Sequence, residues 1–359
     1  MKILFLHGAV KNGGDFLIAH RAQLLIQSIV QNCEIVSMWE GVNFSQKENF
    51  EILEQCDGIV YGGGPFFTNN IYPHDIPLIG DLNHIKKPML NIGGGWFGSD
   101  DKFSTIQNYP MNDKSIQLLR IIESSATQLS CRDWYTVYML REKGFSAAMT
   151  GCPAWYDLNY IDNIDFSLPK EINTICISDP AVSKHTRLAI ELIKWAKERY
   201  PSSAIVLVYH RGYDPNSELY RFAQSNDCII KDISGGYEGF EIYDKCQLHV
   251  GFRVHAHIYN LSHRHFSILI EEDGRGAGVN NALGLSSIKA YGNSRVNNPI
   301  LRKVEFRLAY KINKEFIDEL DALFLKTYKT NGIEYRQAFE RMQFFYAEMK
   351  KHIEIISQW

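Results

Sequence analysis

The sequence contains no long run of apolar residues and no strong excess of charge of either sign. No segment approaches the roughly 20 consecutive apolar residues that span a bilayer, so we expect no integral membrane helix. The 38 basic and 41 acidic residues give a formal net charge of −3, and no block of one sign stands out. Because proteins that bind nucleic acid need a basic surface, nucleic acid is not an expected partner.

Cysteine is sparse and follows no pattern. The seven cysteines are scattered without a C-x-x-C pair, and their number is odd. Thiols of this kind are typical of a reducing compartment, so we expect a cytoplasmic protein without a disulfide framework or a cysteine-based metal site. The opening MKILFLHG breaks its apolar run at His7 and Gly8, too early for the core of a signal peptide. We interpret it as the first strand.

The chain of 359 residues is long enough for two domains, each with its own core. Short apolar strands alternate with helical patterns in both halves, and F-E-I-x-x-x-C occurs once in each. This predicts the α/β class, with two Rossmann-like, doubly wound domains that face each other across a cleft. We place these domains at residues 1–155 and 174–300, joined by a polar linker at 156–173. Residues 301–359 carry amphipathic patterns and are expected to form C-terminal helices.

The strongest local pattern is the stretch from Val250 to Ile258, which combines a strand, a glycine and a cluster of polar side chains. It places Arg253 and His255 between the predicted strand and a following helix, with Gly251 at the strand end. In open α/β sheets this position lies at the ligand crevice, and a helix N-terminus there favours anions. The alternative is a surface arginine beside a core histidine.

Glycine-rich turns follow several other predicted strands. The first turn, Gly8 to Leu17, carries neither a dinucleotide-binding nor a P-loop motif, and Asp15 is placed to cap the next helix. Two glycine runs come later, where either a structural bend or close ligand approach would explain the lost strand stability. The candidate substrate-binding residues from these turns are Asn12, Gly14, Asp15, Gly62, Gly63, Gly64, Gly94 and Gly95.

Charged residues follow two more predicted strands. Arg132 repeats the placement of Arg253, although an ion pair with Asp133 would also explain it. Glu272 and Asp273 follow a later strand, where they could orient a sugar hydroxyl or pair with Arg253.

These motifs occur in the order found in one family. They are N-x-G-D at Asn12–Asp15, the glycine runs at Gly62–Gly64 and Gly93–Gly95, S-x-R-D at Ser130–Asp133 and G-x-R-x-H at Gly251–His255. Over Lys2 to Leu285 the chain therefore resembles the polysaccharide pyruvyl transferases.

The resemblance implies a GT-B arrangement and transfer of the pyruvyl group of phosphoenolpyruvate onto a pair of sugar hydroxyls as a ketal, in cell-surface or exopolysaccharide biosynthesis. It implies a saccharide acceptor, reached by peripheral contact where that acceptor is lipid-linked, and no cofactor or metal besides the donor substrate. By the same resemblance, Arg253, His255 and Arg132 are the expected catalytic, donor-site residues. The chain departs from the family pattern at Cys152, at Ser262–Ser267 and at Arg275, which puts the acceptor identity in doubt.

Elementary chemistry fits this expectation. A donor with a phosphate and a carboxylate calls for fork-shaped cations such as Arg132 and Arg253. Ketal formation begins with protonation of the enol methylene, and His255 is the expected acid near neutral pH.

Three alternatives remain open at this stage. A GT-B glycosyltransferase with a nucleotide-sugar donor would use the same fold. A metal enzyme could use the five histidines between His249 and His265, although a helix beginning at Val254 would send His255 and His257 to different sides. A catalytically silent sugar-binding relative would also keep the fold.

Overall fold

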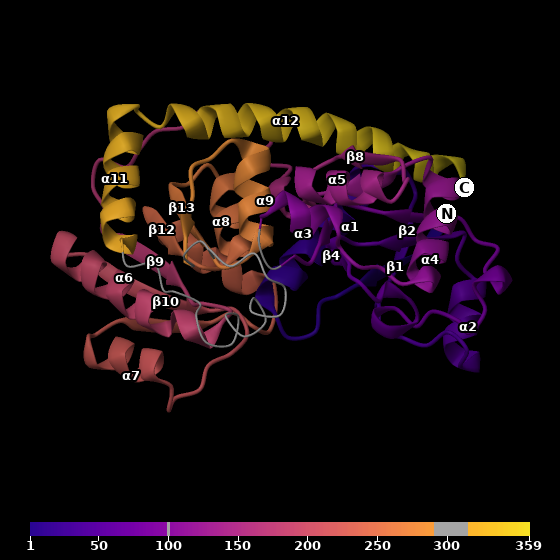
Figure 1. Ribbon diagram of the computed structural model, residues 1–359, viewed down its shortest axis with the longest axis horizontal. Coiled ribbons are helices and arrows are strands. Elements are labelled where there is room, and N and C mark those ends of the chain that lie inside the picture. Colours follow the sequence, from indigo (N-terminus) through magenta and orange to yellow (C-terminus); the bar gives the residue numbers. More distant parts are fainter. Residues whose placement is uncertain (99–100, 291–314) are drawn as a thin grey trace.

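The computed structural model describes residues 1–98, 101–290 and 315–359, and it confirms the α/β class (Figure 1). Every strand pair among these residues is parallel. Parallel strands require crossover connections, and the intervening helices supply most of them. The carboxyl ends of neighbouring strands therefore meet at one edge of each sheet.

The first half contains two four-stranded sheets. One has the order β2-β1-β3-β5 and consists of β2 (Glu34–Trp39), β1 (Lys2–His7), β3 (Gly58–Tyr61) and β5 (Met89–Asn91). The other has the order β4-β6-β7-β8 and consists of β4 (Gly64–Phe67), β6 (Gly94–Trp96), β7 (Leu129–Cys131) and β8 (Ala147–Met149). The chain passes from the first sheet to the second twice.

Both passages occur at the glycine runs. Gly63 lies between β3 and β4 with φ of +89°, and Gly93 lies between β5 and β6 with φ of +57°. A β-carbon on Gly93 would lie 2.5 Å from the Gly151 carbonyl oxygen, so the backbones approach too closely for any side chain. Ser130 fills the bend, because its hydroxyl accepts the Gly93 amide at 2.7 Å. The glycines are therefore explained by the bends that lead the chain from one sheet into the other.

The second half contains one six-stranded sheet of order β11-β10-β9-β12-β13-β14. Its strands are β9 (Thr174–Ser178), β10 (Ala204–Tyr209), β11 (Ile229–Asp232), β12 (Leu248–Gly251), β13 (Ser267–Glu271) and β14 (Ile288–Lys289). Strands β9, β12 and β13 are almost completely buried, as expected for central strands covered on both faces.

The helices cover these sheets and connect their strands. In the first half they are α1 (Gly13–Ile29), α2 (Lys47–Glu54), α3 (Phe103–Gln107), α4 (Asp113–Ala126) and α5 (Trp134–Glu142). In the second half they are α6 (Thr186–Arg199), α7 (Glu218–Ser225), α8 (Val254–Ser262) and α9 (Gly274–Leu283). Residues Glu238–Lys245 form a 3₁₀ helix.

Two C-terminal helices complete the chain, α11 (Phe316–Lys329) and α12 (Ile333–Glu354). Helix α12 runs along one side of the molecule, across both halves (Figure 1). At its start, the Tyr335 hydroxyl donates to the Ser267 carbonyl at 2.7 Å, and near its end the His352 Nε2 lies 2.9 Å from the Asn91 carbonyl oxygen. The helix thus fastens β13 of one half to β5 of the other. The expected domain boundary at residues 300 and 301 lies outside the described residues.

The expected linker, residues 156–173, contains no helix or strand. It is nevertheless held in place, because Arg264 donates to the carbonyls of Tyr160 at 2.7 Å and Asn163 at 2.6 Å. In the described part of the chain, none of the helices has both the length and the apolar character needed to cross a membrane.

Candidate active site

A narrow cleft of about 90 Å³ lies between the two halves, where the carboxyl ends of their strands meet. The first half contributes Asn12, Asp15, Pro65, Phe97 and Arg132. The second half contributes Ala181, His210, Arg211, Phe252, Arg253, Val254, His255, Glu272, Asp273 and Arg275. The structure therefore brings together seven of the residues that the sequence singled out, from motifs more than 250 positions apart. This is the ligand crevice expected of open α/β sheets.

Four arginines line the cleft together with His255. They are Arg132, Arg211, Arg253 and Arg275, and each of them lowers the pKa of the His255 imidazole. Three come from the second half and one from the first. Two of the four, Arg211 and Arg275, were not among the predicted site residues, although Arg211 follows strand β10 as Arg253 follows β12.

Arg253 is held rigidly by a carboxylate that the sequence analysis missed. Its Nε donates to Asp179 Oδ1 at 2.7 Å and its Nη2 donates to Oδ2 at 2.5 Å. Burial alone would lower the pKa of Arg253, but Asp179 outweighs this and raises it. The expectation that Glu272 or Asp273 pairs with Arg253 is wrong, because the partner comes from the end of β9. Asp179 could have been found by the rule that identified Arg253, since it also follows a predicted strand.

Arg132 is less neutralised than Arg253. Its only ion pair among the described residues is with Asp133, at 3.4 Å. Asp133 also caps α5, because its Oδ1 accepts hydrogen bonds from the backbone amide of Thr136 at 2.8 Å and from the Thr136 hydroxyl at 2.9 Å. Gly95 gives Arg132 its place, since a β-carbon on Gly95 would lie 1.9 Å from the Arg132 Nε. The guanidinium of Arg132 is therefore paired less closely with a carboxylate than that of Arg253, so it can bind an anionic ligand.

The two predicted acids hold other parts of the site. Glu272 accepts the amides of Ala181 at 2.7 Å and Val182 at 3.2 Å, and so fixes the loop after β9. Asp273 caps α9 and forms a bidentate ion pair with Arg275, at 3.0 and 2.5 Å. Burial raises the pKa of Asp273, but the opposite effect of Arg275 is larger, so the pKa is lowered overall. Both acids therefore hold parts of the cleft in position, and both line it as predicted; that they orient a sugar hydroxyl stays a prediction.

Asp15 is the acid of the cleft that belongs to the first half. Asn12 caps α1 and donates its side-chain amide to Asp15 Oδ2 at 2.9 Å. Burial raises the pKa of Asp15, and this effect outweighs the hydrogen bond from Asn12 and the nearby guanidinium groups. A carboxylate with a raised pKa can accept a proton.

His255 lies at the centre of the site, in the first turn of α8. A β-carbon on Gly14 would lie 2.2 Å from its Nδ1, so the backbone of α1 forms one wall against the ring. Burial, followed by the four guanidinium groups, lowers the pKa of His255 to about 3. In the ligand-free protein the imidazole is therefore neutral at pH 7. The simple expectation of an acid that is protonated near neutral pH needs correction, because burial, and then the nearby positive charges, lower the pKa of the ring.

The other histidines of the cluster point elsewhere. His257 Nδ1 lies 2.7 Å from the Ser267 hydroxyl and its Nε2 lies 3.1 Å from the Asn280 Oδ1. His249 Nε2 lies 3.0 Å from the Ser178 hydroxyl. Within residues 1–98, 101–290 and 315–359, no group of three or more metal-ligating side chains comes together. His255 is thus separated from its neighbours in sequence by the helical geometry of α8.

The remaining predicted glycines do not line the cleft. A β-carbon on Gly62 would lie 2.2 Å from the Phe5 ring, and one on Gly94 would lie 2.7 Å from the Phe67 ring. Gly63 approaches the Ile92 carbonyl oxygen, while Gly64 has a φ of +79°. Of the two explanations that the sequence offered for these glycines, the structure supports the structural bend, because protein atoms make the close approaches at Gly62, Gly63 and Gly94.

The comparisons with known proteins agree with this architecture. The family model for polysaccharide pyruvyl transferase matches residues 12–265. A search of curated protein sequences finds no significant match.

Among solved structures, a protein proposed to be a UDP-N-acetylglucosamine 2-epimerase from Listeria monocytogenes is 9% identical, with a TM-score of 0.54. The alignment covers 96% of this chain and 90% of that one. The UDP complex of MnaA from S. aureus is 14% identical with a TM-score of 0.48, and it covers 92% and 97% of the two chains. At 9% identity the likeness to the Listeria protein concerns the fold alone, which is GT-B-like.

Proposed function

The chain belongs to the polysaccharide pyruvyl transferase family, and on this premise we propose that it transfers the pyruvyl group of phosphoenolpyruvate to a pair of saccharide hydroxyls as a ketal. The observation that carries the proposal is that four arginines and His255 line one narrow cleft. The acceptor class that we propose is a cell-surface or extracellular polysaccharide, or its precursor, modified in the cytoplasm.

The reaction consumes one proton at the donor and releases two from the acceptor. Protonation of the methylene carbon makes a methyl group and leaves a cation at the neighbouring carbon. The first hydroxyl forms a C–O bond there and loses its proton. The C–O bond to phosphate then breaks, its electron pair leaves with the phosphate, and the second hydroxyl adds and loses its proton. One released proton departs with the phosphate and the other restores the acid.

Arginine side chains suit the donor. The carboxylate of the donor is planar and its phosphate is tetrahedral, and each can accept a pair of hydrogen bonds. A guanidinium presents two such N–H donors in a fixed fork. Asp179 orients Arg253 before a ligand binds. Arg132 has only a 3.4 Å ion pair among the described residues, so its positive charge is less compensated. Arg211 is exposed at the cleft and has no ion pair within the described part of the chain. These three cations supply separate contacts for the two anionic groups.

His255 is the proposed acid, and the donor itself makes this role workable. Burial, and after it the guanidinium groups, lower the pKa of the imidazole to about 3 in the empty cleft. A bound donor brings negative charge beside the same groups, which opposes their effect and raises the pKa again. The imidazole then takes up a proton when the donor binds. Asp15, whose pKa is raised, is the proposed acceptor of a hydroxyl proton.

The rival function is glycosyl transfer from a nucleotide-sugar, because the GT-B fold serves that chemistry as well. The cleft volume favours the smaller donor, since drug-sized ligands occupy sites of roughly 300–1,000 Å³. The test is a thermal-shift comparison of phosphoenolpyruvate with UDP-N-acetylglucosamine and GDP-mannose. A ligand that binds the folded state raises the melting temperature. We expect stabilisation by phosphoenolpyruvate, whereas stabilisation by a nucleotide-sugar alone would favour the rival.

A further inference from the structure

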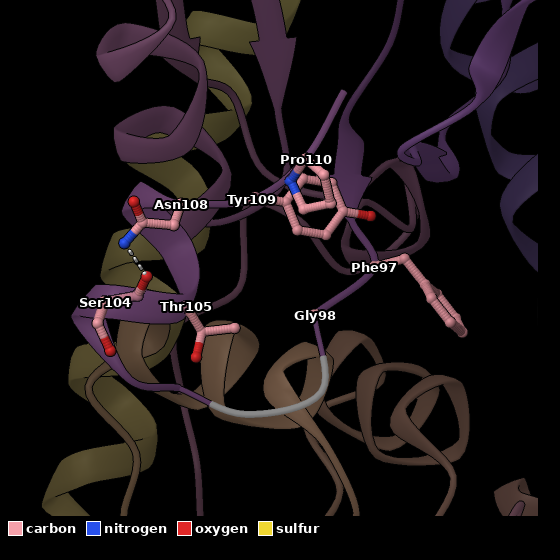
Figure 2. A pocket seen from close by; sticks show the side chains of 7 residues that line it. All are labelled: Phe97, Gly98, Ser104, Thr105, Asn108, Tyr109 and Pro110. Carbon is pink, nitrogen blue, oxygen red and sulfur yellow. Dashed lines mark hydrogen bonds between the residues drawn. The ribbon is translucent and has the colours of Figure 1, made fainter. Parts of the chain in front are cut away.

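A second hollow lies beside the cleft, between the end of β6 and helix α3 (Figure 2). Its volume is about 490 Å³, within the roughly 300–1,000 Å³ of small-molecule sites. The side chains that line it are Phe97, Ser104, Thr105, Asn108, Tyr109 and Pro110. None of these described lining residues carries a charge. The hollow therefore differs in chemistry from the arginine-rich cleft.

Phe97 belongs to both spaces. It lines the cleft and the hollow, and its side chain is 54% exposed. In Figure 2 its ring points away from Tyr109, with Gly98 following it along the chain. The guanidinium carbon of Arg275 lies 5.0 Å from the centre of the Phe97 ring. Phe97 is thus shared by the two spaces, and its ring lies beside a cation of the cleft.

Two residues of the wall of the hollow, Tyr109 and Asn108, are held in place by contacts with neighbouring residues. Tyr109 is 9% exposed and packs edge-on against Trp96, with ring centres 5.6 Å apart. Burial raises the pKa of Tyr109 to about 12, so the phenol stays neutral at physiological pH. On the other side, Asn108 donates to the Ser104 carbonyl at 2.8 Å and closes the end of α3. That bond uses one of the two amide hydrogens of Asn108.

The hollow is also fixed relative to the cleft. The Gly98 carbonyl accepts the amide of Gly274, the first residue of α9, at 3.2 Å. Asp101 forms an ion pair with Lys289 of β14 at 2.6 Å. Both contacts join this part of the first half to the second half, on the same side as Asp273 and Arg275. A ligand in the hollow therefore lies at a defined distance from a ligand in the cleft.

We propose that this hollow binds the acceptor, as a neutral hexopyranoside unit of the saccharide. The inference rests on the proposed function, in which the donor anions occupy the arginine-rich cleft. A sugar presents apolar C–H faces to rings such as those of Tyr109 and Pro110, and hydroxyls to groups such as Thr105 and Asn108. The uncharged aromatic and hydroxyl-bearing side chains of its described lining suit a neutral sugar, whereas the cationic cleft suits phosphate and carboxylate. The exposed Phe97, which the two spaces share, would hold the reacting hydroxyls against the donor.

The experiment measures sugar binding and donor binding separately in the same protein. The probes are methyl β-galactoside, methyl β-glucoside and methyl N-acetyl-β-mannosaminide, each detected by saturation-transfer NMR, and phosphoenolpyruvate, detected by thermal shift. Thr105→Trp fills the hollow, and Thr105→Val removes only the hydroxyl. Gln107→Trp is the matched control, because Gln107 lies on the same short helix, is exposed and does not line the hollow.

We expect Thr105→Trp to weaken binding of at least one glycoside by more than about tenfold, and Thr105→Val by about two- to tenfold, the usual worth of one hydrogen bond. Gln107→Trp should bind like the wild type, and all three variants should keep the stabilisation by phosphoenolpyruvate. Unchanged glycoside binding in Thr105→Trp, or no glycoside binding by the wild type while phosphoenolpyruvate binds, would overturn the acceptor site. Glycoside binding through Thr105 without any effect of phosphoenolpyruvate would instead overturn the proposed donor and leave the sugar site standing.

Discussion

The imidazole of His255 lies so close to the backbone of Gly14 that a β-carbon on Gly14 would lie 2.2 Å from its Nδ1. The two residues belong to helices of different halves, α8 and α1. Gly13, the preceding residue, donates its amide to the His210 carbonyl at 3.0 Å. The N-terminus of α1 is therefore docked against the second half, and this docking sets the position of the candidate acid.

Replacement of Gly14 by alanine should disturb the site more than the fold. Alanine in a helix is ordinarily favourable by about 0.5–1 kcal/mol over glycine, but here its methyl group must displace the His255 ring. We expect a loss of ketal formation of at least about tenfold with little change in the melting temperature. Gly80→Ala is the control, because a β-carbon there meets nothing within 4 Å. Normal turnover in Gly14→Ala would show that the contact has no catalytic role.

The two predicted arginines should differ in their effect on stability. Both Arg132→Ala and Arg253→Ala should weaken binding of phosphoenolpyruvate by about 1.5–3 kcal/mol, measured by calorimetry. Arg253→Ala should also lower the melting temperature more, because it leaves the buried Asp179 without its partner. Lysine at either position should restore binding only partly, since it lacks the fork. Unchanged donor affinity in both alanine variants would contradict the donor site.

Arg211 offers a test without this structural cost. It is exposed and lines the cleft, so Arg211→Ala should leave the free energy of unfolding unchanged within about 0.5 kcal/mol. The same variant should weaken the binding of phosphoenolpyruvate. Arg187→Ala, outside the cleft, serves as a control for the loss of one positive charge. Equal effects of the two replacements would mean that Arg211 acts only through net charge.

His255→Gln should separate catalysis from folding. A positioned general acid contributes about two to four orders of magnitude, so we expect turnover to fall by that much while the protein still binds the donor. His257→Gln should reduce turnover far less, because His257 contacts Ser267 and Asn280 instead of the cleft. A normal rate in His255→Gln, measured with a working acceptor, would remove this histidine from the mechanism.

Donor binding should become tighter as the pH falls through the neutral range. His255 has a pKa of about 3 in the empty cleft, and a bound anion raises this value, so binding takes up a proton. By linkage, lower pH favours the state that binds more protons, which is the complex. His255→Gln should flatten the part of this dependence that does not come from the phosphate of the donor itself. Identical pH profiles for wild type and variant would contradict the proton uptake.

Acid should destabilise the fold through His257. Burial lowers its pKa from 6.5 to about 3, so between these values the unfolded chain binds a proton that the folded chain does not. Its contribution to stability is complete above pH 6.5 and is lost as the pH falls towards 3, at up to about 1.4 kcal/mol per pH unit. Urea denaturation of His257→Gln should show a shallower loss over this window. An unchanged slope would mean that other groups govern acid unfolding.

The sequence by itself determined the local features of this protein. The apolar alternation, the glycine and the following helical pattern of Val250–Ile258 correctly predicted that β12 ends near Gly251 and that α8 begins at Val254. Side-chain periodicity is a property of neighbouring residues, so it can be read without knowledge of distant ones. The same reasoning located Arg132 after β7 and predicted the parallel α/β architecture.

Only the tertiary structure decided which distant residues meet. The pairing of Arg253 with Asp179, the contact of Gly14 with His255 and the use of the glycine runs as bends depend on how separate strands and halves pack. No local pattern encodes these contacts, because each requires two segments whose order in space is set by the whole core. The low pKa of His255 follows from the same cause, since the packing of the two halves buries the ring, and its guanidinium neighbours come from four separate strand ends.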